Sequence, residues 1–260
     1  NAGLGGTAPL VSTVLMLGLP AKLAGCRVRV LATPPGRDGK VDPRLLAAAK
    51  LAGITAVVRA GGAQAIAALA DGTASVPKVD KIFGPGNAWV AEAKRQLYGV
   101  VGIDMVAGPS EIVVVADRDN DPAWIAADLM SQAEHDPTSQ SILITDDKAL
   151  AADVAAAVER LLDELGGAAV ESWARHGAII TLASLGDAAA LIDRLAPEHL
   201  EIATADPQAL FDRIRHAGSV FLGRHTPEAV GDYVGGPNHV LPTGRRARFA
   251  SGLSVADFMK

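Results

Sequence analysis

Several features that would point to particular classes of protein are scarce or missing in this sequence. Cys26 is the only cysteine, which excludes an internal disulfide and fits a reducing compartment. No apolar run reaches the roughly 18 residues that a membrane span needs. Residues 1–6 lack the basic region and apolar core of a signal peptide. We therefore expect a soluble, cytoplasmic protein.

An excess of positive charge is also missing. The chain has 24 lysines and arginines against 29 aspartates and glutamates, which gives a formal net charge of −5. This balance provides no basic surface for the phosphates of DNA or RNA, or for acidic lipid. We therefore expect neither a nucleic-acid partner nor a membrane partner.

The residues that are present describe a globular chain. Hydrophobic residues make up 49% and charged residues 20% of the 260 positions, enough to bury a sizeable core. The length favours two domains, and we place a soft boundary within 105–120, with a first lobe over 1–108 and a second over 109–260. The 166–174 region has a loose pattern and is expected to be a loop.

Helical and strand patterns alternate along the chain. Strands are expected over 27–32, 54–59, 81–83, 112–116, 141–145, 178–182, 200–203 and 218–222. Helices are expected over 9–24 (kinked or split in two), 43–52, 63–70, 88–98, 122–134, 147–164, 187–195 and 207–215. This order is typical of parallel βαβ units. The predicted fold class is α/β, with two Rossmann-like lobes whose largely parallel sheets are flanked by helices.

Two glycine loops lie between an expected strand and an expected helix. They are Gly61-Gly62-Ala63-Gln64 and Gly84-Pro85-Gly86-Asn87. Main-chain amides at such helix starts can face a phosphate, although both loops could equally be simple tight turns. Gly3-x-Gly5-x-x-Ala8 matches a dinucleotide fingerprint formally, but no strand precedes it, so we discount it.

Three clusters carry side chains suited to metal or proton chemistry. Gln132 and His135 are three residues apart, so on a helix they share a face and could bind one ion, or form a polar helix end. Glu198 and His199 precede an apolar strand and suit acid–base work, the alternative being an exposed loop pair. The loop from Asp232 to 239 could supply further ligands or be ordinary surface. A catalytic zinc accepts nitrogen and oxygen ligands and keeps one position open.

Five sequence blocks together resemble one known family. The blocks are Gly84-Pro85-Gly86-Asn87, Asp104-Met105-Val106-Ala107-Gly108-Pro109-Ser110-Glu111, Ser131-Gln132-Ala133-Glu134-His135, Pro197-Glu198-His199-Leu200 and Asn238-His239-Val240-Leu241-Pro242-Thr243. In this order and spacing they resemble the signature blocks of the histidinol dehydrogenase family, over essentially the whole chain. The resemblance implies a homodimeric enzyme with NAD and Zn²⁺ as cofactors. That enzyme oxidises L-histidinol through L-histidinal to L-histidine, in two hydride transfers.

The resemblance also implies roles for individual residues. Gln132, His135 and Asp232 match the zinc ligands. His199 would take the proton from the alcohol as the hydride leaves, and Glu198 would activate water for the aldehyde step.

Contacts to substrate and cofactor are implied in the same way. The substrate-binding residues are Ser110, Gln132, His135, His199, Asp232 and His239. The NAD-binding residues are Gln64 and Asn87, one in each of the two glycine loops.

The chain also departs from the family pattern. Family members carry a long N-terminal region, and a C-terminal tail with a further histidine ligand and a glutamate for substrate. The segment over 3–10 resembles a family segment that normally holds an NAD-binding tyrosine, which is absent here. We expect the chain to correspond to the catalytic core. The alternatives are a related zinc-dependent dehydrogenase of another polyol, and a truncated homologue without catalysis.

Overall fold

The computed structural model describes residues 10–260. The glycine-rich start around Gly3 and Gly5, and the family segment discussed with it, lie outside the described residues. The internal contacts of the chain divide it into two compact units. The first unit holds 10–107, Asn238–Val240 and Leu253–Lys260, and the second holds Gly108–Pro237 and Leu241–Gly252. The return of the last residues to the first unit is not signalled by the sequence pattern.

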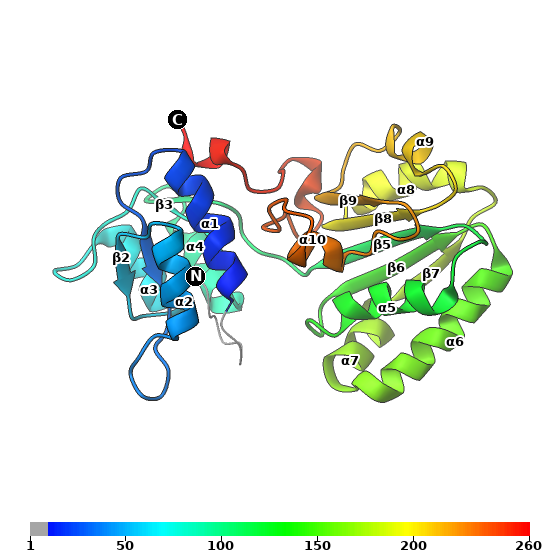
Figure 1. The fold of residues 1–260 in the computed structure, drawn as a ribbon, viewed down its shortest axis with the longest axis horizontal. Helices are drawn as coiled ribbons and strands as arrows, with labels where there is room; N and C mark the ends of the chain where they lie inside the picture. Colours follow the sequence, from blue (N-terminus) through cyan, green and yellow to red (C-terminus); the bar gives the residue numbers. More distant parts are fainter. Residues whose placement is uncertain (1–9) are drawn as a thin grey trace. The chain divides into compact units, whose positions relative to one another are not determined.

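The second unit is built on a parallel sheet of five strands (Figure 1). Its strands are β5 (Glu111–Ala116), β6 (Gln140–Thr145), β7 (Ala178–Thr181), β8 (His199–Ala203) and β9 (Ser219–Leu222). Their spatial order is β7-β6-β5-β8-β9, and every neighbouring pair is parallel. The connections therefore wind outward in both directions from β5, as in a doubly wound fold. The expected α/β class with parallel sheets is confirmed.

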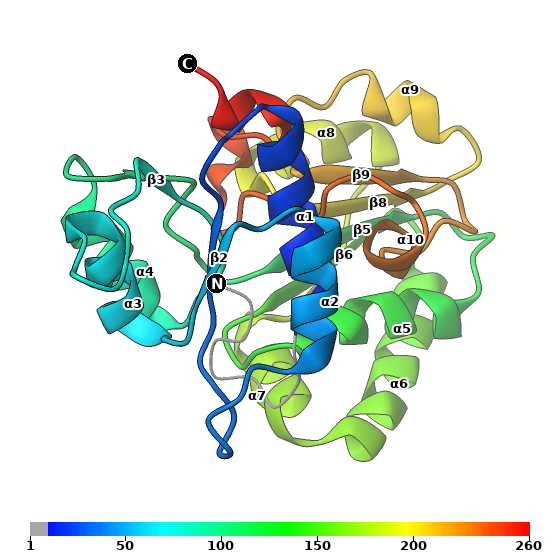
Figure 2. The same ribbon diagram turned by 60° about the vertical axis from the view of Figure 1, so that its left-hand side comes forward.

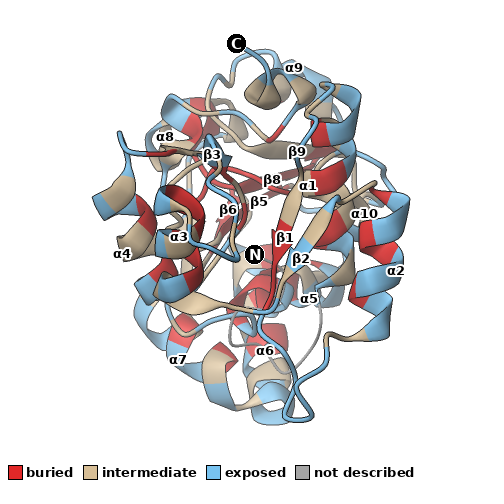
Figure 3. Cartoon of the chain, turned by 90° about the vertical axis from the view of Figure 1, so that its left-hand side faces the viewer, coloured by how far each residue is buried: buried red, intermediate tan, exposed pale blue. Residues whose placement is uncertain are grey.

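Helices cover both faces of this sheet, so its central strand is buried throughout. Along β5, Ile112 and Val114 pack toward one set of helices, while Val113 and Val115 pack toward the other. The first set is α5 (Pro122–Ala133), α6 (Lys148–Leu165) and α7 (Gly167–His176), and the second includes α8 (Ala188–Leu195) and α9 (Pro207–Phe211). Buried residues dominate β5, β6 and β8 (Figure 3). A continuous apolar run is what such a two-sided environment requires.

The expected loop over 166–174 is wrong, because α7 occupies most of this stretch. Gly166 and Gly167 both have positive φ, so α6 ends there and a separate helix begins. Within α7, Ala169 and Trp173 pack against the core beneath α5, and the Ser172 hydroxyl donates a hydrogen bond to the Ser139 carbonyl. Tertiary packing therefore stabilises a helix whose own apolar pattern is weak.

The first unit contains four α-helices, one 3-10 helix (Val255–Phe258) and four short strands among its described residues. The α-helices and strands follow in chain order. They are α1 (Val11–Leu23), β1 (Val30–Ala32), α2 (Pro43–Leu51), β2 (Ala56–Val58), α3 (Gly62–Asp71), β3 (Lys81–Ile82), α4 (Ala88–Leu97) and β4 (Gly102–Ile103). The strands form two parallel pairs, β1 with β2 and β3 with β4. The two-residue β4 carries too little pattern to be predicted. Helices α1 and α2 pack side by side through Val14 and Leu45 (Figure 2).

Helix α1 is continuous through Pro20. The sequence is compatible with either one kinked helix or two short helices at this point. Proline has no N–H, so the Met16 carbonyl loses its usual donor four residues along the helix. The Asn238 side chain donates a hydrogen bond to that carbonyl at 2.7 Å instead, and its own amide oxygen accepts one from the Val240 N–H at 3.0 Å. One side chain therefore completes α1 and fixes the segment that returns to the first unit.

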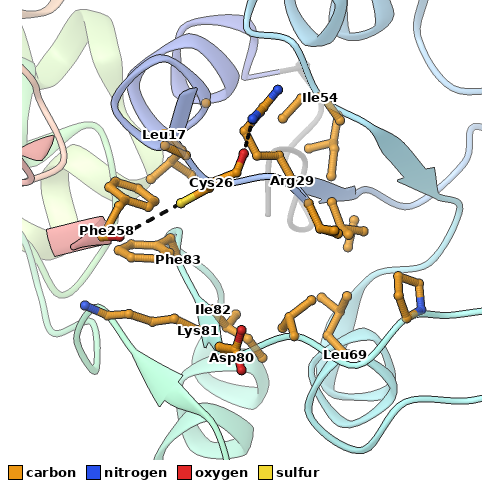
Figure 4. A pocket seen from close by; sticks show the side chains of 18 of the residues that line it. Leu17, Cys26, Arg29, Ile54, Leu69, Asp80, Lys81, Ile82, Phe83 and Phe258 are labelled. Carbon is orange, nitrogen blue, oxygen red and sulfur yellow. Dashed lines mark hydrogen bonds between the residues drawn. The ribbon is translucent and has the colours of Figure 1, made fainter. Parts of the chain in front are cut away.

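A cavity of about 750 Å³ lies within the first unit (Figure 4). Its walls come from α1, from the segments that lead into β1 and β3, and from the last residues of the chain. The rings of Phe83 and Phe258 stack with centroids 4.0 Å apart on one side of it, and Lys81 donates to the Asp257 carbonyl. No residue proposed from the sequence as a binding residue lines this cavity. Separately, no helix among residues 10–260 has the length and apolar character needed to cross a membrane.

Asn238→Ala removes the donor that replaces the missing N–H of Pro20. We expect the free energy of unfolding to fall by about 1 kcal/mol. The Pro20→Ala background gives residue 20 its own N–H, so the same change should cost less there. Denaturant unfolding of the two single variants and the double variant measures this coupling, and simply additive losses would contradict the account.

Candidate active site

Helix α5 and strand β8 carry the centre of the candidate site. The Oε1 atom of Gln132, near the end of α5, lies 3.1 Å from Nδ1 of His199, the first residue of β8. Both side chains are buried. A carboxamide oxygen can only accept, so Nδ1 of His199 carries the proton and donates it. In the neutral ring, Nε2 is then left as the atom that accepts a proton.

A second contact joins the same two elements beside the first. Asp128 lies four residues before Gln132 on α5, and Glu201 lies two residues after His199 on β8, so both pairs face each other. The carboxyl groups of Asp128 and Glu201 are hydrogen-bonded to each other. Burial raises the pKa of both carboxyls above their usual range, and Asp128 raises that of Glu201 further. The pair therefore retains a proton at neutral pH.

Two more buried carboxyls lie where β5 and β8 begin. The main-chain N–H of Glu111 donates to the side chain of Glu198, and the N–H of Glu198 donates to the side chain of Glu111. Burial raises the pKa of Glu198 to about 8 and that of Glu111 to about 7. The Ser110 hydroxyl donates to Glu198, while the Oε2 atom of Glu198 is buried without a hydrogen-bond partner among the described residues.

The backbone around Glu198 is tightly constrained. Helix α8 ends at Ala196, which has a left-handed φ of 46° and is fully buried, a conformation that costs about 1 kcal/mol for a residue with a Cβ. Beyond it, the N–H of Ser219 donates to the Glu198 carbonyl at 2.8 Å. A Cβ on Gly218 would lie 2.6 Å from that same oxygen, so only glycine allows this approach. These contacts fix where the Glu198 side chain begins.

Glu228 and Phe221 also lie beside His199. The Oε1 atom of Glu228 lies 3.5 Å from Nε2 of His199, and the Phe221 ring lies 6.3 Å from the imidazole ring. Burial raises the pKa of Glu228 to about 7, with a further contribution from Asp232. Glu228 precedes the short helix α10 (Ala229–Tyr233), in which a Cβ on Gly231 would meet the Phe221 ring at 2.9 Å. The ring therefore packs directly against the helix backbone.

The structure gathers some of the residues proposed from sequence within the second unit. Ser110, Gln132, Glu198 and His199 cluster at the amino ends of β5 and β8 and at the end of α5. Ligands of open α/β sheets usually bind at the opposite, carboxyl ends of the strands. The location of this cluster is therefore unusual for the fold.

The proposed metal ligands are less closely grouped. His135, just after α5, and Asp232, in α10, are exposed, whereas Gln132 is buried. Among residues 10–260, no group of three or more histidine, cysteine, aspartate and glutamate side chains is gathered closely enough to hold a metal ion. Gln132 is not one of these residue types. The set of Gln132, His135 and Asp232 as metal ligands therefore stays a prediction.

The other proposed residues belong to the first unit. Gln64, in the first turn of α3, is exposed, and so is Asn87, whose side chain caps α4 by accepting from the Val90 N–H at 3.2 Å. His239 is half-buried in the segment Asn238–Val240. Gln64 and Asn87 thus each lie at the start of a helix, as a phosphate-binding loop requires.

Sequence reasoning missed four carboxyls of the cluster: Glu111, Asp128, Glu201 and Glu228. A signal existed for two of them. Glu201 interrupts an apolar strand on the same face as His199, and Asp128 lies one helical turn before Gln132. Glu228 has no such signal, because a loop places it.

A doubly wound parallel sheet with a buried cluster of carboxyls and one imidazole defines an α/β protein with the groups that enzymes use for proton transfer. Comparison with known proteins gives the particular family. The histidinol dehydrogenase family profile matches residues 4–260. The chain therefore belongs to the histidinol dehydrogenase family, which is a family of oxidoreductases.

Individual relatives agree with this assignment. The histidinol dehydrogenase of Zymomonas mobilis is 65% identical over 98% of this chain, and that of Rhodospirillum rubrum is 62% identical over 98%. A crystal structure of histidinol dehydrogenase from Elizabethkingia anophelis superimposes on all of this chain with a TM-score of 0.94 and 46% identity. The chain spans about 60% of the length of these relatives.

Glu201→Gln tests the proton held between Glu201 and Asp128. Glu201 has a raised pKa in the folded protein, so its contribution to stability is complete below its usual pKa of 4.5 and is lost as the pH rises toward the raised value. Glutamine cannot ionise, so the variant should lose less stability between about pH 5 and about pH 8, by roughly 1 kcal/mol or more. Thermal unfolding at both pH values measures this difference.

The control for that experiment is Glu159→Gln, at an exposed position on α6. This control should keep the pH dependence of the parent chain. If Glu201→Gln also keeps it, Glu201 is ionised in the folded protein and the pair holds no proton.

Proposed function

We propose that this chain carries the catalytic groups of an NAD-dependent dehydrogenase. It would oxidise L-histidinol through L-histidinal to L-histidine, the last steps of histidine biosynthesis. The observation that supports this proposal best is the buried Glu198–His199 pair, whose imidazole is oriented by Gln132. Membership of the family supports L-histidinol as the substrate. The pair supports the chemistry, because oxidation of an alcohol and then of a hydrated aldehyde requires a base for the alcohol and a base for water.

His199 is suited to remove the proton of the alcohol. Gln132 holds the proton on Nδ1, so Nε2 accepts the alcohol proton while the hydride leaves for the nicotinamide. The imidazolium formed is then stabilised by the carboxylate of Glu228, 3.5 Å from Nε2.

Glu198 is suited to the second step, in which water adds to the aldehyde. Its pKa of about 8 puts its loss of a proton close to neutral pH, as an acid–base catalyst needs. Its Oε2 atom is buried and has no hydrogen-bond partner among the described residues, so it would accept a proton from a water molecule admitted beside it. Activity that depends on the Glu198 carboxylate should therefore rise with pH through about 8.

A cation fits the neighbourhood of His199. Glu198, Glu201 and Glu228 each have a pKa raised by burial and by neighbouring acids, with no lysine or arginine among the causes. The proposed zinc ligands, Gln132, His135 and Asp232, supply one amide oxygen, one imidazole nitrogen and one carboxylate, a donor set that suits catalytic zinc. When bound, zinc polarises the alcohol oxygen of the substrate.

The proposal also includes the contacts of substrate and cofactor. Ser110, Gln132, His135, His199, Asp232 and His239 are the proposed contacts of L-histidinol, and Gln64 and Asn87 those of NAD. The ammonium group of histidinol is complementary to the acidic cluster. We further propose a homodimer, as the family resemblance implies, and a cytoplasmic location, which the unpaired Cys26 supports.

NADH formation from L-histidinol tests this function. Absorbance is followed with and without added zinc, on this chain and on the Zymomonas mobilis relative as a positive control. The proposal predicts zinc-dependent turnover by this chain. No turnover by this chain under conditions in which the relative is active would contradict it.

Glu198→Gln separates the two oxidation steps. We expect the oxidation of L-histidinal to slow by about 100-fold or more, as for the loss of a general base, while the oxidation of L-histidinol slows much less. The two substrates are assayed separately by NADH formation, with the exposed Glu164→Gln as a control. Equal losses in both steps would count against the role of Glu198.

His135→Ala tests the proposed metal ligand. Removing one of the proposed donors should lower bound zinc and turnover together, by about tenfold or more in affinity. Elemental analysis after dialysis gives the zinc content, and His176→Ala, at the end of α7, is the matched control. Unchanged zinc content in His135→Ala would show that His135 is not a ligand.

A further inference from the structure

The first unit contains a buried ion pair next to one of the two glycine loops. Lys94, in α4, and Asp104, just after β4, are hydrogen-bonded through their charged groups. Each side chain is only 3% exposed. Among the ion pairs found within residues 10–260, both partners are this deeply buried only here.

Both charged groups also bind the main chain of Gly84. The ammonium group of Lys94 donates to the Gly84 carbonyl at 3.0 Å, and the Gly84 N–H donates to Oδ2 of Asp104 at 2.6 Å. Gly84 is buried and has a φ of +118°, which residues with a Cβ rarely adopt. The ion pair therefore holds the peptide groups on both sides of a glycine in one particular conformation.

The held glycine begins the loop that leads into α4. Pro85 has a fixed φ, and Asn87 closes the loop by capping the helix. The loop thus has a restraint at each end: the ion pair at Gly84 and the cap at Asn87. Both ends of the loop are therefore held without any ligand.

General stability is a poor explanation for such a pair. Burying two charges costs several kcal/mol for each ion, and well-packed apolar residues of the same volume are often at least as stabilising. A buried pair does give directional hydrogen bonds, which apolar side chains cannot give. The geometry that these bonds impose on Gly84 is therefore their specific contribution.

We propose that Lys94 and Asp104 are positioning residues for the nicotinamide dinucleotide, acting through the Gly84–Asn87 loop. This inference rests on the proposed function, in which Asn87 contacts NAD. Neither residue touches the dinucleotide itself, because both side chains are almost completely buried. They hold the loop in the conformation that binds the dinucleotide. The entropy lost on ordering the loop therefore does not weaken binding.

Lys94→Met and the double variant Lys94→Met/Asp104→Leu test this role. Amide exchange of Gly84, whose N–H donates to Asp104, should speed up by about tenfold without nucleotide. The Kd for NAD, measured by calorimetry, should rise by about tenfold. At saturating NAD the kcat should stay close to that of the parent chain. The double variant should lose little more affinity for NAD than the single variant, because Lys94 and Asp104 hold Gly84 together.

Leu45→Ala is the matched control, since Leu45 is buried in α2 of the same unit and lies away from the loop. It should lower the melting temperature and leave both the loop exchange and the Kd for NAD unchanged. Equal effects in this control, or unchanged exchange and affinity in folded Lys94→Met, would overturn the inference. A parent chain that binds no NAD would instead contradict the cofactor assignment, and this inference with it.

Discussion

Gln132 on α5 and His199 on β8 are joined by a hydrogen bond between buried groups, and the geometry of the rest of the site depends on it. Four residues of helix and two residues of strand both advance the chain by about 6 Å. The contact between Gln132 and His199 is therefore repeated one step along by Asp128 and Glu201. Packing of α5 on the sheet, through Leu129 and its neighbours, sets the separation at which both contacts form. The apolar core thereby sets the distance between Gln132 and the imidazole of His199.

The electrostatics of the site follow from the same burial. Glu111, Glu198, Glu201 and Glu228 all have pKa values raised chiefly by the loss of water. Such a cluster is costly for folding and is found mainly where proton transfer or cation binding requires it. The candidate site lies at the amino ends of β5 and β8. The fold class alone would direct attention to the opposite edge of the sheet.

The sequence predicted the parts of this structure that are governed by local pattern. The apolar run of β5 and the Asp-Pro starts of α2 and α5 identify buried strands and helix beginnings directly. It failed where distant residues decide the outcome. Helix α7 exists because Ser172 and Trp173 find partners elsewhere in the second unit. The sequence left open whether one helix or two spans Pro20, where Asn238, far along the chain, supplies the missing donor of α1.

The same division explains what the sequence revealed about the site. Glu198 and His199 can be proposed from sequence because they are adjacent in the chain and precede an apolar run. Glu228 was not recognised, because a loop brings it to His199 and nothing near it in sequence signals the contact. The buried pair of Lys94 and Asp104 was missed for the same reason, since its meaning appears only at Gly84.

The central claim is that Gln132 fixes the proton of His199 on Nδ1, which leaves Nε2 to accept the proton of the alcohol. Nitrogen-15 NMR of the imidazole, at a pH where His199 is neutral, reads the tautomer directly. The account predicts a protonated Nδ1 and an unprotonated Nε2. A protonated Nε2 would contradict it, because the imidazole could then accept no proton at the atom that faces Glu228.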